Sequence, residues 1–164
     1  MVASAVPQSA HEIYNQGLHK AKRRQHQAAI LDYDLAISID PNHAAMYYDR
    51  AVAKYNLRQY QAAIADYDLT VAADPNYAYA YSNRGAIKYY NLSDKRGAIV
   101  DYDLAIAVNP NFGEAYYNRG ITKEASGDKQ GGIRDLKMAI ELFQQQDLTG
   151  KYQQATNLVK KWER

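Results

Sequence analysis

A phrase of six residues recurs along the chain and constrains its architecture more than any other feature. "DYDLAI" occupies residues 32–37 and 101–106, and "DYDLTV" occupies residues 66–71. Each copy is followed by a proline, and these prolines recur at steps of 34 and 35 residues: Pro41, Pro75 and Pro110. A fixed period of this length is typical of chains built from stacked copies of one small motif.

The period divides the chain into four units. They cover residues 10–43, 44–77, 78–112 and 113–146. Apolar residues recur three and four positions apart in each unit, and a proline cannot continue the helix before it, so each unit predicts two helices. Ser9 with Glu12 predicts a capping box that opens the first unit. Asp128 predicts a cap for the second helix of the last unit.

The two ends of the chain are predicted to differ from the units. Residues 1–9 are expected to be a flexible lead, since they lack the basic start and apolar core of a signal peptide, which is the less favoured alternative. Residues 147–164 predict a capping helix, because a terminal repeat must cover its apolar face. Its apolar residues recur at helical steps: Leu148, Tyr152, Ala155, Leu158, Val159 and Trp162.

This pattern resembles the tetratricopeptide repeat over residues 10–146. That family has a large residue at repeat position 4, which here is Ile13, Tyr47, Tyr81 and Tyr116. Its small residue at position 8 is Gly17, Ala51, Gly85 and Gly120, and its aromatic residue at position 24 is Tyr33, Tyr67, Tyr102 and Leu136. Three residues depart from the family pattern. Thr70 stands where a small residue is expected, Leu136 replaces the aromatic residue and Gln144 replaces the proline. The resemblance implies an all-α, right-handed superhelical solenoid of helix–turn–helix repeats.

The 16 tyrosines fall into two groups. Nine occupy positions that helix packing explains: Tyr33, Tyr47, Tyr60, Tyr67, Tyr77, Tyr81, Tyr102, Tyr116 and Tyr152. The other seven lie on the first helices, at positions that line the concave face in the resembling family: Tyr14, Tyr48, Tyr55, Tyr79, Tyr89, Tyr90 and Tyr117. Partial burial between repeats and a ligand-binding groove are both open for these seven. We favour the groove, because tyrosine is enriched at interfaces.

Asparagines and apolar residues extend the predicted groove. In the resembling family, an Asn at position 6 hydrogen-bonds the backbone of a bound peptide, since an amide both donates and accepts. Asp49 departs from the other residues at this position because a carboxylate only accepts. The predicted peptide-binding residues are Tyr14, Asn15, Leu18, Tyr48, Val52, Tyr55, Tyr79, Asn83, Tyr89, Tyr90, Tyr117, Asn118 and Ile121.

One well-known ligand of the family is not expected. Repeats that hold the acidic C-terminal tail of chaperones use a cluster of Lys, Arg and Asn. The comparable positions here carry Tyr14 and Leu18 in the first unit, and Tyr79 and Asn83 in the third. The cations that would bind a tail carboxylate are therefore missing.

Charged residues also recur at fixed repeat positions. Position 7 carries Arg50, Arg84 and Arg119, and position 23 carries Asp32, Asp66, Asp101 and Asp135. The arginines predict ion pairs with these aspartates within or between repeats. Gln16 replaces the arginine of the first unit, so Asp32 is expected to be unpaired. The lysines at position 11 are expected to form a solvated or snorkelling face: Lys20, Lys54, Lys88 and Lys123.

Position 26 is usually polar in the resembling family but is apolar here. The residues are Leu35, Leu69, Leu104 and Met138. Two interpretations are open. These side chains either pack on the first helix of the next unit, which we favour, or form an apolar ridge for a partner or for a second copy of the chain.

No enzyme motif, metal site or cofactor site is expected. The chain has no Cys, and its four His follow no metal-ligand spacing. The two carboxylates of each "DYD" phrase point roughly 200° apart on a helix, so they cannot share one ion. The net charge is +2, and the densest basic stretch, "HKAKRRQH" at 19–26, makes nucleic-acid binding only a minor alternative.

The sequence therefore predicts a non-catalytic, cytoplasmic protein–protein interaction module without a membrane span. It is expected to bind a peptide segment of a partner in the tyrosine-lined groove, and the resemblance implies a scaffold or assembly-factor role. A monomer is favoured. The alternative is a homo-oligomeric structural module that associates through the position-26 ridge.

We predict that the basic stretch does not bind nucleic acid. Random single- and double-stranded oligonucleotides should show no binding at physiological salt in fluorescence anisotropy, because no wider basic surface accompanies the stretch. A micromolar complex that weakens steeply with salt, and is lost in Lys22→Ala/Arg23→Ala, would contradict this prediction.

Overall fold

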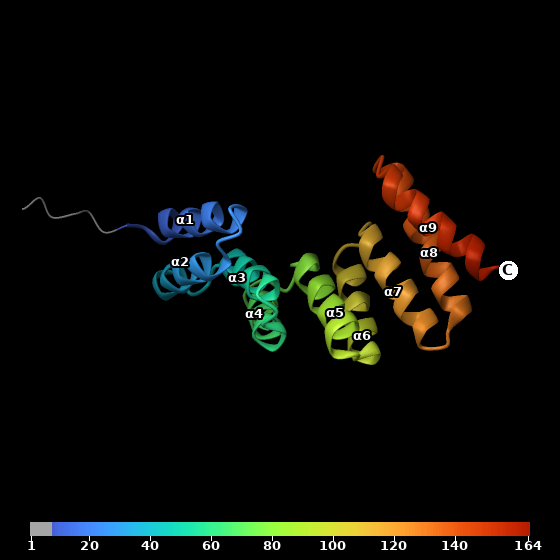
Figure 1. The fold of residues 1–164 in the computed structure, drawn as a ribbon, viewed down its shortest axis with the longest axis horizontal. Helices are drawn as coiled ribbons and strands as arrows, with labels where there is room; N and C mark the ends of the chain where they lie inside the picture. Colours follow the sequence, from blue (N-terminus) through green and yellow to red (C-terminus); the bar gives the residue numbers. More distant parts are fainter. Residues whose placement is uncertain (1–7) are drawn as a thin grey trace, which may run out of the picture. The chain divides into compact units, whose positions relative to one another are not determined.

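The computed structural model describes residues 8–164, which form nine α-helices and no strand (Figure 1). The helices are α1 (Ala10–Lys22), α2 (His26–Ile39), α3 (Ala44–Asn56), α4 (Tyr60–Ala73), α5 (Ala78–Leu92), α6 (Lys95–Val108), α7 (Gly113–Ala125), α8 (Lys129–Gln145) and α9 (Thr149–Trp162). The all-α prediction is confirmed. Most of the predicted flexible lead, residues 1–7, lies outside the described part of the chain.

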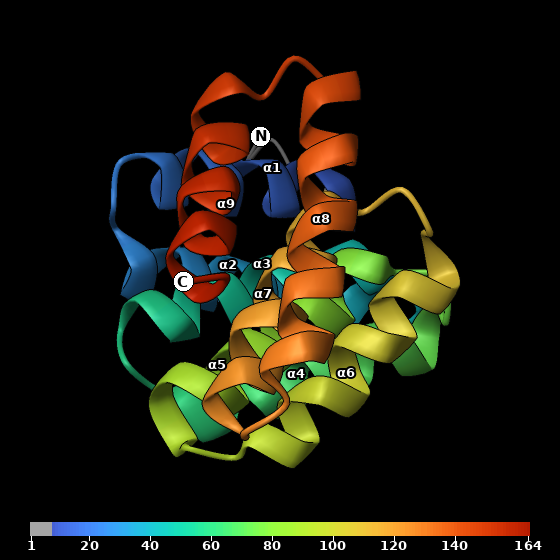
Figure 2. The same cartoon turned by 90° about the vertical axis from the view of Figure 1, so that its right-hand side faces the viewer.

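The chain divides into two compact units, Met1–Pro75 and Asn76–Arg164. The first contains the hairpins α1–α2 and α3–α4, and the second contains α5–α6, α7–α8 and the single helix α9. Helices that follow one another pack together within each unit, including α2 with α3, α6 with α7 and α8 with α9. Figure 2 shows α8 and α9 as neighbouring helices. Each unit is therefore a stack of helical hairpins with its own core.

Local capping signals begin three of the helices. The predicted capping box is confirmed, because Ser9 accepts a hydrogen bond from the Glu12 backbone N–H and the Glu12 carboxylate accepts one from Ser9. The predicted cap at Asp128 is also confirmed, since its carboxylate accepts from the Gly131 N–H at 2.8 Å. Asp94 caps α6 in the same way. These caps satisfy backbone donors that a helix leaves unpaired at its start.

Large rings facing small residues form the centre of each hairpin. Tyr33 and Tyr102 are fully buried, and Tyr67 is nearly so. A Cβ atom added to Gly17 would lie 2.6 Å from the ring of Tyr33, so the α1–α2 hairpin needs a glycine there. In the last hairpin the aromatic ring is replaced by Leu136, and the two backbones approach more closely. A Cβ on Gly120 would lie only 2.9 Å from the Gly132 carbonyl oxygen.

The apolar residues at position 26 are exposed. Leu35 is 52% exposed, Leu69 44%, Leu104 40% and Met138 41%. The favoured expectation that they pack on the next unit's first helix is therefore wrong. On α2 the buried stripe contains Ala29, Tyr33 and Ala36, and Leu35 lies roughly 200° around the helix from Tyr33, so it faces away from the neighbouring helices.

Helix α9 covers the apolar side of α8. Ala155 and Val159 are buried against Ile133, Leu136 and Phe143. Tyr152, Leu158 and Trp162 pack around them and are partly buried. This is the packing expected of a capping helix.

None of the helices described above is long and apolar enough to cross a membrane.

We predict that truncating a core tyrosine destabilises the protein far more than truncating an exposed one. Tyr67→Ala should lower the free energy of unfolding by about 3–5 kcal/mol, because it leaves a cavity between α3 and α4. Tyr55, at 43% exposed, is the control in the same unit. Tyr55→Ala should cost no more than about 0.5–1 kcal/mol in chemical denaturation. Equal losses in the two variants would contradict the packing described here.

A second stability prediction concerns α9. Deleting residues 148–164 should expose Ile133 and Phe143 and cause aggregation or loss of helicity in α8, because both side chains are buried in the intact unit. Light scattering and circular dichroism measure these effects, and removal of Arg164 alone is the control. A truncated chain that stays monomeric and loses only the helicity of α9 itself would disprove the capping role.

Candidate peptide-binding site

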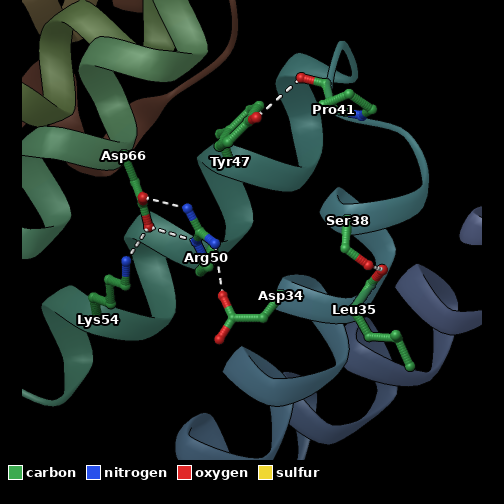
Figure 3. A network of polar contacts seen from close by, with 8 residues as sticks. All are labelled: Asp34, Leu35, Ser38, Pro41, Tyr47, Arg50, Lys54 and Asp66. Atoms are coloured by element: carbon green, nitrogen blue, oxygen red, sulfur yellow. Dashed lines mark hydrogen bonds and ion pairs between the residues drawn. The ribbon is translucent and has the colours of Figure 1, made fainter.

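In three of the hairpins, a buried aspartate binds two cations and so joins the helix that carries the predicted site residues to its partner helix. In the α3–α4 hairpin, Arg50 and Lys54 approach opposite oxygens of Asp66 at 2.7 Å each (Figure 3). Arg84 and Lys88 hold Asp101 in the α5–α6 hairpin, and Arg119 and Lys123 hold Asp135 in the α7–α8 hairpin. The predicted Arg–Asp pairs are confirmed.

Two expectations about these charges are wrong. The lysines at position 11 do not form a merely solvated face, because Lys20, Lys54, Lys88 and Lys123 each bind the aspartate of their own hairpin. Asp32 is also paired, since the Nζ of Lys20 lies 2.6 Å from its carboxylate. The lysine follows the arginine position by one helical turn, so both side chains reach the same carboxylate from one helix face.

The second aspartate of the repeated phrase links successive hairpins. Asp34 of α2 lies 2.6 Å from Arg50 of α3, as Figure 3 shows, and Asp103 of α6 lies 2.6 Å from Arg119 of α7. Burial alone would lower the pKa of Arg50, but its bonds to Asp66 and Asp34 raise that pKa above its usual range. This link between hairpins was not predicted from the sequence, although both aspartates recur in each "DYD" phrase.

The same arginines also make cation–π contacts with tyrosine rings. Arg50 lies 5.5 Å from the ring centroid of Tyr47, and Arg119 lies 5.4 Å from that of Tyr116. The hydroxyl of Tyr47 donates to the Pro41 carbonyl at 2.9 Å (Figure 3). These tyrosines have the structural role expected of repeat position 4.

In the first unit, Tyr14 does not line an open surface. Its side chain is only 8% exposed, and its ring centroid lies 5.9 Å from that of Tyr33. Its hydroxyl donates to the carboxylate of Asp49 on α3. Tyr14 therefore belongs to the core of this unit, because it fills the space where α1, α2 and α3 meet.

The other predicted residues of the first unit are more accessible. Tyr55 is exposed, and Tyr48 is partly buried with its ring centroid 5.7 Å from that of Tyr67. Asn15, Leu18 and Val52 are partly buried. This unit therefore presents one exposed tyrosine on its first helices.

The second unit presents more aromatic surface. Tyr79 is 57% exposed and Tyr90 58% exposed, both on α5. Burial of part of the Tyr90 ring raises its pKa, and the nearby phenols of Tyr89 and Tyr117 raise it further. Tyr90 of α5 and Tyr117 of α7 therefore lie near one another across two helices that are in contact. The remaining predicted residues are partly buried: Asn83, Tyr89, Tyr117, Asn118 and Ile121.

A cavity of about 200 Å³ lies within the second unit, where α7, α8 and α9 meet. Its lining residues are Glu114, Tyr117, Asn118, Phe143, Lys151 and Gln154. Tyr117 and Asn118 were predicted from the sequence. Glu114 of α7 was not predicted, nor were Phe143, Lys151 and Gln154, which only the packing of α8 and α9 brings beside α7.

Between residues 8 and 164, no group of three or more His, Cys, Asp or Glu side chains is placed to hold a metal ion.

Comparison with known proteins identifies the repeat. A family model described as the tetratricopeptide repeat matches residues 16–88. The helical hairpins of the structure, with small residues facing large rings, agree with the pattern of this repeat. Residues 16–88 thus match the tetratricopeptide repeat, and the helical fold of the solved structures below is similar over most of the chain. Proteins of this family are in general non-catalytic modules for protein–protein interaction.

Solved structures share the fold. A crystal structure of MamA is 23% identical and superposes with a TM-score of 0.79 over 84% of this chain and 80% of that one. MamA from Desulfovibrio magneticus RS-1 is 20% identical, with a TM-score of 0.76 over 98% of both chains. The first repeat domain of Spaghetti (RPAP3), bound to the HSP90 peptide SRMEEVD, is 27% identical, with a TM-score of 0.69 over 76% of this chain and 98% of that one. Among curated protein sequences, none matches this chain.

We predict that Asp49→Asn stabilises the protein at neutral pH. Burial raises the pKa of Asp49, although the bond from Tyr14 opposes this, so ionisation of Asp49 costs stability in the folded state. Asparagine still accepts a hydrogen bond and carries no charge. The gain should be present at pH 7 and vanish below the ordinary Asp pKa of about 3.9, where the carboxyl is protonated in both states. Thermal melts at pH 7 and pH 3 test this, and a variant less stable at pH 7 would contradict it.

Proposed function

We propose that the second unit binds a peptide segment of a partner protein on the faces of α5 and α7. The observation that carries this proposal is the aromatic surface. Tyr79 and Tyr90 of α5 are more than half exposed, and Tyr117 and Asn118 of the contacting helix α7 line a cavity. Grouped exposed aromatic side chains usually mark a binding surface, and tyrosine is among the residues enriched there.

The rigidity of the helices supports this function. The carboxylates of Asp101 and Asp135 tie α5 and α7 to their partner helices, and Asp103 ties α6 to Arg119 of α7. Tyrosine has few rotatable bonds, so a peptide that binds rings on a fixed helix loses little conformational entropy of the protein. The amides of Asn83 and Asn118 supply donors and acceptors for the peptide backbone.

In the first unit, we propose a peptide-binding surface with fewer accessible residues. We assign Asn15, Leu18, Tyr48, Val52 and Tyr55 to a second binding surface there, and we leave out the buried Tyr14. We also propose that the ligand is not an acidic tail such as the peptide in the Spaghetti complex. The positions that would need cations carry Leu18, Tyr79 and Asn83. A cytoplasmic scaffold or assembly factor is the cellular role we propose.

A second candidate function is association between copies of the chain. On α2, Leu31, Leu35 and Ile39 lie one turn apart and are 64%, 52% and 52% exposed. On α6, Val100 and Leu104 repeat this arrangement at 56% and 40% exposure. These stripes lie on the second helices, so they are distinct from the tyrosine surface.

Paired variants separate the two candidates. Partner capture from the native host should be lost with Tyr79→Ala/Tyr90→Ala, and the matched pair Leu31→Ala/Leu35→Ala on α2 should retain it. Once the partner peptide is known, each tyrosine should contribute at least about tenfold in Kd, or about 1.4 kcal/mol. The leucine pair should melt with the wild type, because both side chains are exposed. Circular dichroism must show that the tyrosine pair stays folded, because Tyr79 and Tyr90 contact the rings of Phe112 and Tyr89. Retention of the partner by the tyrosine variant would disprove the peptide surface.

Sedimentation tests the second candidate directly. We expect a monomer at low micromolar concentration. A concentration-independent dimer that Leu69→Glu/Leu104→Glu converts into a folded monomer would instead establish association through the exposed position-26 residues.

A further inference from the structure

Lys151 connects α9 to the cavity of the second unit. Its ammonium group binds the carboxylate of Glu114 in the first turn of α7. It also lies 5.8 Å from the ring centroid of Phe143 on α8. An aromatic face beside a carboxylate is a general recognition site for a lysine or arginine side chain. The cavity therefore contains a cation site, which α9 fills with a residue of its own.

The position of Lys151 in α9 is electrostatically unfavourable. It lies in the first turn, where the helix dipole disfavours a positive charge, and no acidic residue of that turn compensates it. Leu148 provides no side-chain cap, and the neighbouring Gly150 has open space around it. Asp147, just before the helix, has a left-handed φ of 56°. Tertiary contacts therefore hold the first turn of α9: Lys151 contacts Glu114 and Phe143, and Leu148 and Tyr152 pack on the core.

The rest of α9 does not depend on Lys151. Ala155 and Val159 are buried in the core of this unit. Lys137 of α8 pairs with Glu163 near the other end of α9 at 2.8 Å. Loss of the Lys151 contact therefore leaves the capping helix in place.

We propose that this cavity takes a lysine or arginine side chain of the bound peptide, in the place that Lys151 occupies in the free protein. This inference rests on the proposed function and names the class of peptide side chain that the cavity would bind. The cavity holds about 200 Å³, less than the roughly 300–1,000 Å³ of a drug-sized ligand pocket, and so suits one side chain. Displacing Lys151 from Glu114 costs little free energy, because their side chains are 46% and 34% exposed and exposed ion pairs contribute little stability.

The chemistry of the lining favours a cation over an anion. When Lys151 moves away, Glu114 is the one charged group left among the lining residues, so the cavity becomes negative. The amide oxygens of Asn118 and Gln154 can accept from a guanidinium or ammonium group. The rings of Tyr117 and Phe143, with centroids 6.3 Å apart, add two aromatic neighbours for its alkyl chain and charge.

Lys151→Ala in the full chain tests the proposal with a defined probe. The probe is N-acetyl-arginine amide, and the neutral isostere N-acetyl-citrulline amide is its comparison. Titration followed by NMR signals of Phe143 and Tyr117 should show Lys151→Ala binding the arginine probe about fivefold more tightly than the wild type, because the internal competitor is gone. Adding Glu114→Gln should reduce arginine binding to the citrulline level.

Lys137→Ala is the matched control, because it removes the other ion pair of α9 and leaves the cavity unchanged. It should bind the arginine probe as the wild type does. Lys151→Gln, which removes the charge and keeps the helix side chain long, serves if Lys151→Ala loses the helicity of α9. The proposal is overturned if neither Lys151 variant gains affinity, or if citrulline binds as well as arginine.

The test is independent of the proposed function. A captured partner that requires Tyr79 and Tyr90, together with unchanged arginine affinity in the Lys151 variants, would overturn the cation site alone. Tightened arginine binding in Lys151→Ala supports the cation site even when partner capture does not depend on the two tyrosines.

Discussion

The fold of each unit depends on a charged aspartate placed where two helices of a hairpin meet. Asp66, Asp101 and Asp135 are at most 6% exposed. A carboxylate so buried is unfavourable unless cations and hydrogen bonds replace its water, and removal of one partner of such a pair generally costs about 3–5 kcal/mol. Here an arginine and a lysine from the facing helix supply the positive charge and the hydrogen bonds that the carboxylate needs. The same arginine takes a second aspartate from the preceding hairpin where both hairpins lie in one unit, so a single side chain orients three helices.

This arrangement explains why the first helices can carry tyrosines that do not contribute to the core. The contact inside each hairpin is made by small residues, a buried ring and the charged cluster, as with Gly17, Tyr33 and Asp32. Where a hairpin precedes it in the same unit, the first helix also packs on that hairpin's second helix, and only the remainder of its surface is exposed. In the second unit, Tyr79 and Tyr90 remain more than half exposed, although their rings contact those of Phe112 and Tyr89.

Helix α9 has two roles that use different parts of its length. Its central residues, Ala155 and Val159, close the apolar core that α8 would otherwise expose. Its first turn extends to α7 through Lys151 and Glu114, which are 37 residues apart in the chain. The core packing holds the cap whether or not Lys151 keeps its contact with Glu114.

The sequence by itself determined the helical hairpins, the caps at Ser9 and Asp128, the Arg–Asp pairs and the small-to-large packing. Each of these depends on spacing within one repeat, which helical geometry converts directly into contacts. The tertiary structure alone decided the burial of Tyr14, the pairing of Lys20 with Asp32, the exposure of Leu35 and the cavity around Phe143. Those features depend on which faces meet when separate helices pack, and a difference of one position around a helix, roughly 100°, changes a buried side chain into an exposed one.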